Sequence, residues 1–132
     1  MAMSFNSILG LNENALVLRA KRAEVLASNI ANANTPGYKA RDFDFHKALK
    51  VATSQQTSGI NRTNQAHFSG VSSDLPVQLQ YITPFQAGTG DGNTVDLPSQ
   101  QVAFGENAME YQMSLRFLNG KLKGLLSAIK GE

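Results

Sequence analysis

The sequence predicts a mainly α-helical protein. Two long helices, one near each end of the chain, are expected to pair as an antiparallel coiled-coil-like unit, with a small irregular or β segment between them. Apolar residues recur at helical spacing in residues 7–33, and at strict heptad spacing in residues 99–130. Residues 53–98 are instead rich in Ser, Thr, Gln, Asn and Gly and have no helical periodicity.

The N-terminal helix is predicted from an apolar residue at every seventh position: Leu9, Leu16, Ala23 and Ile30. Small residues dominate its second half, so a partner helix could approach closely there. Pro36 disfavours helical angles at Thr35, and Gly37 tolerates a left-handed turn. The helix is therefore expected to span residues 7–33 and to end in a turn.

The middle of the chain gives weaker signals. The alternation from Asp42 to Phe45 predicts a short extended stretch, followed by one or two helical turns through Leu49. The best strand candidate beyond it is residues 77–82, where apolar and polar residues alternate. A single strand cannot bury itself, so this region is either a small β element or flexible until assembled.

The C-terminal helix carries the clearest pattern in the sequence. Its seam follows 4-3 spacing through Phe104, Ala108, Tyr111, Leu115, Leu118, Leu122, Leu125 and Ile129. A second stripe consists of Val102, Met109, Met113 and Phe117, so the apolar face is wide enough for more than one neighbour. Gly120 and Gly124 each cost about 1 kcal/mol relative to Ala in a helix. They are explained where another backbone packs closely or where the helix must bend.

The segment between these two helices contains few large apolar residues, so it offers the helices little core to pack against. In a monomer the second stripe would stay in contact with water, and exposed apolar patches of that size mark interfaces. The sequence therefore predicts an assembly subunit that completes its burial against other chains. Three segments are expected: residues 1–37, 38–95 and 96–132, with the two ends forming one structural domain.

Composition argues against other classes. The chain has no Cys, which excludes disulfides, thiolate zinc sites and Cys nucleophiles. His46 and His67 have no paired carboxylate at ligand spacing, and no nucleophile, base and orienting group can be named. We expect no enzyme, cofactor or metal site.

The basic cluster Arg19, Lys21 and Arg22 keeps open a second interpretation, a small helical nucleic-acid or protein binding module. The net charge of only +2 does not favour it. No cleavable signal sequence and no membrane span are recognised.

Residues 27–39, with the sequence ASNIANANTPGYK, closely resemble the signature of the bacterial flagellar basal-body rod protein family. The signature residues are Asn29, Ile30, Asn32, Asn34, Thr35, Pro36, Gly37 and Tyr38. Further similarity to the short, proximal-rod members lies in residues 41–43, Arg62-Thr63, His67, residues 91–97, residues 106–108 and Tyr111-Gln112. Residues 98–101 depart from the family, which usually has acidic residues there.

The resemblance implies a structural subunit of the proximal rod, part of the drive shaft and of the export channel wall. Implied partners are other copies of the chain, neighbouring rod proteins, the rod adaptor at the membrane ring and the flagellar type III export apparatus. The implied location is the periplasmic rod of the basal body, reached without signal-peptide cleavage. Phe5 and Leu9 match the family's short export pattern, as do Phe45 and Leu49. Asn29, Asn32 and Asn34 are expected either to bond backbone groups left unpaired where the helix ends, or to contact another subunit.

Overall fold

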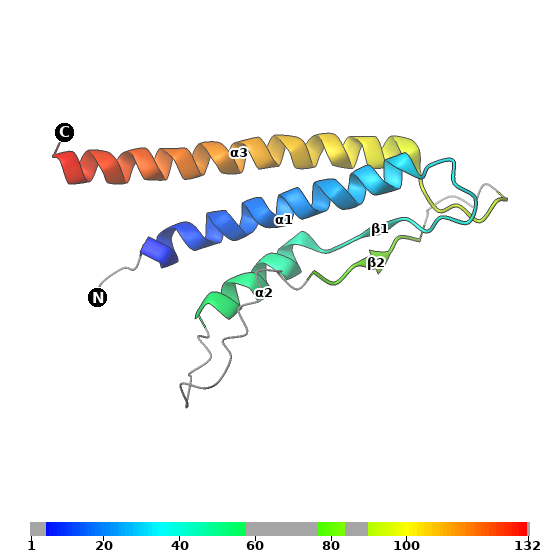
Figure 1. Ribbon diagram of the computed structural model, residues 1–132, viewed down its shortest axis with the longest axis horizontal. Coiled ribbons are helices and arrows are strands. Elements are labelled where there is room, and N and C mark those ends of the chain that lie inside the picture. The colour runs from blue at the N-terminus through cyan, green and yellow to red at the C-terminus, as the bar shows by residue number, and fades with distance from the viewer. Residues whose placement is uncertain (1–4, 58–76, 84–89, 132) are drawn as a thin grey trace, which may run out of the picture.

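The computed structural model describes residues 5–57, 77–83 and 90–131. In this part of the chain the elements are, in order, α1 (Phe5–Ala31), β1 (Arg41–Asp42), α2 (Phe45–Thr57), β2 (Gln80–Tyr81) and α3 (Leu97–Lys130). Helix α3 runs antiparallel to α1, while α2 and the strands lie on the other side of α1 (Figure 1). The predicted fold class, mainly α with paired terminal helices and a small β element, is confirmed.

Helix α1 ends at Ala31, slightly before the predicted boundary, and the chain then turns through residues 32–37. Gly37 has the left-handed conformation predicted for it, with φ of 72°. An L side chain rarely adopts this conformation, so the residue fixes the direction in which the chain leaves the helix.

Helix α2 is longer than the one or two turns predicted, since it spans 13 residues. The additional turns lie beyond Leu49, where the sequence indicated no helix. At its start, the carboxylate of Asp44 accepts a hydrogen bond from the backbone N–H of Lys47 at 3.0 Å, and its carbonyl accepts one from Ala48 at 3.0 Å. Asp44, which the sequence interpretation assigned to an extended stretch, therefore caps the start of the helix.

The predicted strand at residues 77–82 is mostly not a strand. Only Gln80 and Tyr81 pair with β1, antiparallel, with Arg41 opposite Tyr81 and Asp42 opposite Gln80. The N–H of Ile82 also donates to the carbonyl of Ala40 at 2.9 Å. The remaining candidates of the middle region, Arg62-Thr63 and His67, lie outside the described residues.

The apolar core is small and centres on α1. Among the described residues, Leu18 and Leu26 are fully buried, and Ala40, Phe43 and Ala52 are the other buried apolar side chains. Burying a Leu or Phe side chain stabilises a fold by about 1.5–3 kcal/mol, so this core is a modest source of stability. Polar contacts must contribute to holding the helices together.

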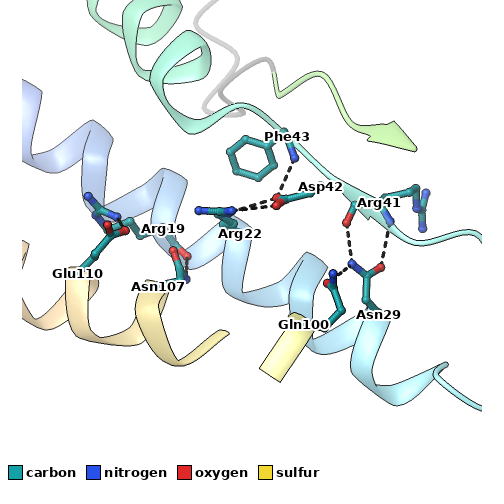
Figure 2. A network of polar contacts seen from close by, with 9 residues as sticks. All are labelled: Arg19, Arg22, Asn29, Arg41, Asp42, Phe43, Gln100, Asn107 and Glu110. Atoms are coloured by element: carbon teal, nitrogen blue, oxygen red, sulfur yellow. Dashed lines mark hydrogen bonds and ion pairs between the residues drawn. The ribbon is translucent and has the colours of Figure 1, made fainter. Parts of the chain in front are cut away.

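Arg19 of α1 contacts both other helices, and Figure 2 shows it beside Glu110 and Asn107 of α3. Its guanidinium lies 4.3 Å from the centroid of the Phe45 ring in α2. On the other side it donates to Ser114 Oγ at 3.2 Å and pairs with Glu110, both in α3. Its carbonyl accepts a hydrogen bond from the Asn107 side chain at 2.9 Å. The loss of this one side chain would loosen both faces of α1.

Arg22, one turn further along α1, holds the start of the β element. It donates to both carboxylate oxygens of Asp42, at 3.2 and 2.9 Å. The hydrogen bond to Asp42 is the main cause that raises the pKa of Arg22 above its ordinary value. A raised arginine pKa contributes stability that is lost only in strongly alkaline solution, as the pH rises through the folded-state pKa. The Arg22 side of the pair therefore adds no pH dependence near neutrality.

We predict that Arg19→Met lowers the free energy of unfolding by about 2 kcal/mol, because a cation–π contact and charge-assisted hydrogen bonds are lost together. Urea unfolding followed by circular dichroism measures the change. Arg116→Met is the matched control: Arg116 is an exposed cation of α3, and its removal should change stability by less than about 0.5 kcal/mol. Equal losses in the two variants would contradict the role assigned to Arg19.

Candidate assembly surface

Polar side chains supply the hydrogen bonds between α1 and α3. Gln100, Asn107 and Ser114 are spaced seven residues apart on α3 and point toward α1. Gln100 and Asn107 are the only residues of α3, within its described length, that are buried. The side chain of Gln100 accepts a hydrogen bond from Asn29 at 2.8 Å, at the other end of the seam from Arg19. The helices are therefore held in register by hydrogen bonds.

This polar seam rotates the predicted heptad stripe partly away from α1. Tyr111, Leu118 and Leu125 are half-buried, whereas the other five positions of the stripe are exposed: Phe104, Ala108, Leu115, Leu122 and Ile129. On α1 all four predicted positions, Leu9, Leu16, Ala23 and Ile30, are half-buried. The structure thus brings only part of the predicted seam into the contact between the two helices. The residues that make the remaining contacts with α1 could have been recognised from the seven-residue repeat of Gln100, Asn107 and Ser114.

The second predicted stripe lies on the outside of α3. Val102, Met109, Met113 and Phe117 are 61%, 66%, 55% and 62% exposed. Met109 follows Asn107 by two residues, which places it on nearly the opposite side of the helix from the seam. Bulky apolar side chains exposed along one line of a helix are typical of an interface with another chain. We define these four residues as the outer stripe.

Asn29 anchors the start of the signature. Its side-chain amide donates to the carbonyl of Arg41 at 2.7 Å, and its Oδ1 accepts from the N–H of Arg41 at 3.1 Å (Figure 2). The side chain therefore pairs with Arg41 much as a neighbouring strand would. Together with the bond to Gln100, this contact links α1, β1 and α3. Asn29 is fully buried, and it bonds β1 and α3 where the sequence interpretation favoured the end of α1 or another subunit.

Other signature residues shape the turn itself. Asn32 donates from its side chain to the carbonyl of Ser28 at 2.8 Å and accepts from the Thr35 hydroxyl at 3.1 Å, so it does bond the end of α1. The Tyr38 hydroxyl lies 3.1 Å from that of Ser28. Asn34, in contrast, is exposed. Asn29, Asn32 and Tyr38 therefore bond within the subunit, whereas Asn34 and the following Thr35, Pro36 and Gly37 are exposed.

A distant residue, Asn93, caps the end of α1. Its buried side-chain amide lies within hydrogen-bonding distance of three carbonyls at the turn, those of Asn32, Ala33 and Thr35, at 3.0, 2.9 and 2.9 Å. The last turn of a helix leaves such carbonyls without partners. Here one side chain from a distant part of the sequence donates to them. The sequence interpretation gave residues 91–97 only as a resemblance to the family, and nothing local in the sequence marks Asn93 as a cap.

The backbone on either side of Asn93 docks on the same turn. Gly37 donates to the carbonyl of Asp91 at 2.9 Å, and Thr94 donates to the carbonyl of Tyr38 at 3.0 Å. The Lys39 ammonium donates to the carbonyl of Gly92 at 2.7 Å. The signature turn and residues 91–94 therefore form one hydrogen-bonded unit, which we call the signature latch.

We predict that Asn93→Asp destabilises the fold by about 2 kcal/mol or more. The carboxylate cannot donate, and it places a negative charge against the three carbonyls. The thermal midpoint, followed by circular dichroism, measures the loss. Asn34→Asp makes the same chemical change at an exposed position of the same turn, and it should leave the midpoint nearly unchanged. A similar midpoint in both variants would contradict the capping role.

Neither a metal site nor a membrane-spanning helix is recognised among the described residues. No group of three or more His, Cys, Asp or Glu side chains that could hold a metal ion occurs among them. None of the helices in the described part is both long and apolar enough to span a membrane. His46, on α2, is exposed and lies edge-on against the Phe45 ring.

Comparison with known proteins places these features in a family. The family model described as "Flagella basal body rod protein" matches residues 11–39, which cover much of α1 and the signature turn. The flagellar basal body rod protein FlgB of Aeromonas hydrophila is 52% identical over 132 residues, covering 100% of this chain and 99% of the relative. The FlgB proteins of Salmonella typhimurium and Escherichia coli K12 are 41% and 39% identical. Their alignments cover 96% and 98% of this chain, and 95% and 98% of those relatives. The chain belongs to the FlgB family of flagellar basal body rod proteins.

Proposed function

We propose that the chain is a structural subunit of the proximal rod of the bacterial flagellar basal body. It polymerises through helix packing and forms part of the drive shaft and of the export channel wall. The family is one of structural rod proteins and not of enzymes. The observation that carries the packing mechanism is the division of α3 into a polar inner seam and an exposed apolar outer stripe.

This division suits a wall subunit. The hydrogen bonds of the seam fix how α1 and α3 pair within one subunit, so that apolar area remains for contacts between subunits. Burying a Met or Phe side chain is worth about 1.5–3 kcal/mol, and the outer stripe offers four large apolar side chains. A subunit that forms such contacts on more than one side gains stability only in the assembled state. Residues 1–37 and 96–132 act in this proposal as the packing domain, with residues 38–95 as an accessory segment.

The proposed partners are other copies of the chain, neighbouring rod proteins, the rod adaptor at the membrane ring and the type III export apparatus. The names of the relatives support a place in the basal body. We further propose the periplasmic rod as the location and export without signal-peptide cleavage. The small apolar core is compatible with passage through an export channel in the unfolded state, because little burial opposes unfolding. In the signature, Asn34 is the residue proposed to contact a neighbour.

The alternative, a nucleic-acid binding module, is not favoured. Two of the three cations in its basic cluster are engaged within the chain: Arg19 pairs with Glu110, and Arg22 pairs with Asp42. A phosphate-binding surface needs cations that are available to the phosphates. The cluster therefore serves the fold.

We predict that Leu122→Asp blocks rod assembly and motility while secretion of the subunit continues. Leu122 is a partly exposed member of the heptad stripe, and a carboxylate there would be buried without a partner at a helix contact. Swimming in soft agar and immunoblotting of periplasmic and culture fractions measure the two effects separately. Asn119→Asp, at an exposed polar position nearby, is the control and should swim normally. Normal motility of Leu122→Asp would refute the packing role of that position.

We predict that deleting residues 5–9, which removes Phe5 and Leu9, reduces secretion of the subunit at least tenfold. These residues form the first turn of α1, and the proposal assigns them to recognition by the export apparatus. The double variant Phe45→Ala/Leu49→Ala, at the second matching pattern, serves as the comparison and should be secreted normally. Undiminished secretion after the deletion would rule out Phe5 and Leu9 as the export signal.

A further inference from the structure

The face of α3 that carries the outer stripe changes character halfway along the helix. The N-terminal half of this face is bulky, since it holds the outer stripe itself, Val102, Met109, Met113 and Phe117, all more than half exposed. The same three- and four-residue spacing then continues through Gly120, Gly124 and Ala128, which are also exposed. One face of one helix therefore presents large side chains in its first half and a shallow surface in its second half.

The two glycines of the shallow half are not required by the subunit itself. A Cβ added at Gly120 or Gly124 would meet nothing within 4 Å in the described structure. Both residues have helical backbone angles, and any L residue would adopt them more readily than glycine. A reason for keeping this surface shallow must therefore come from outside the chain.

Charge is divided along α3 in the same way. Glu106 and Glu110 lie in the bulky half, with Arg116 near its end, whereas the charged residues of the shallow half, Lys121, Lys123 and Lys130, are all basic. All six are exposed, and Glu110 keeps half of its side chain exposed while it pairs with Arg19. Two such helices packed side by side in register would place bulky on bulky and like charges together. A shift along the axis instead brings bulky against shallow and acidic against basic.

We propose that the outer stripe packs against the shallow half of a parallel C-terminal helix in the next subunit along the rod. This inference rests on the proposed rod function and specifies the contact. The occupant is a helix with small residues at four-residue spacing flanked by lysines, the chemistry of this chain's own residues 120–130. The displacement that aligns the two halves is about fourteen residues, or about 21 Å at 1.5 Å per residue. An antiparallel pairing would also match the halves, but it closes into a dimer and cannot extend an axial structure.

A substitution that improves the isolated helix but fills the shallow surface tests the proposal. Gly124→Leu should raise the helicity and the thermal midpoint of the purified subunit, because leucine is the better helix former and a Cβ at this position meets nothing within 4 Å in the described structure. It should nevertheless abolish swimming. Asn119→Leu, which adds a similar side chain on another side of the helix, should leave swimming intact. Normal swimming of Gly124→Leu would overturn the proposal.

A photo-crosslinking residue at Met109 maps the contact directly in purified basal bodies. We expect crosslinks to the C-terminal helix of a rod-family subunit, in the part that aligns with residues 120–128 of this chain. Crosslinks to the bulky half of a neighbouring helix, to an N-terminal helix, or to a protein outside the rod family would overturn the proposed contact while leaving the rod function in place. Absence of the chain from purified basal bodies would instead overturn the proposed function itself.

Discussion

The arrangement of the subunit depends on the buried side chain of Asn29. This one carboxamide pairs with both backbone groups of Arg41 and also bonds Gln100 across the seam. It therefore fixes where the chain goes after α1 and where α3 lies against α1. Another residue of similar size could fill the space but could not donate and accept in these directions at once. The turn, the small β element and the position of α3 all follow from this contact.

The pairing of the terminal helices is specified by polarity more than by apolar area. Buried polar contacts are weak evidence for stability, but they can fix register, because a shifted pairing leaves buried groups without partners. In this subunit, Gln100 meets Asn29 near one end of the contact, and Asn107 and Ser114 meet Arg19 further along. Apolar side chains that a leucine-rich helix pair would bury therefore remain on the surface. The residues that fix the helix pairing and those that we propose for contacts between subunits therefore lie on different sides of α3.

Much of this fold could be predicted from the sequence, because the spacing of apolar residues within a long periodic segment indicates its secondary structure without information from the rest of the chain. The two terminal helices, the turn at Gly37 and the exposed stripe at Met109 and Phe117 follow from spacing and from glycine and proline chemistry. The cap at Asp44 was missed because that residue was assigned to an alternating strand pattern, and the polar residues that follow Val51 gave no sign that α2 continues to Thr57. The faces of α3 were partly misassigned because apolar periodicity was considered without the polar repeat that begins at Gln100. Asn93 could not be found, since its partners lie about 60 residues earlier in the chain.

The signature latch has a consequence for the order in which the subunit can take shape. The carbonyls at the end of α1 are satisfied by Asn93, and Gly37 and Tyr38 bond its immediate neighbours. A chain that is delivered N-terminus first, from a ribosome or through a narrow conduit, presents the signature long before residues 91–94 emerge. The end of its first helix then frays until the last third of the chain arrives. Folding of the subunit is therefore completed only near the end of its delivery.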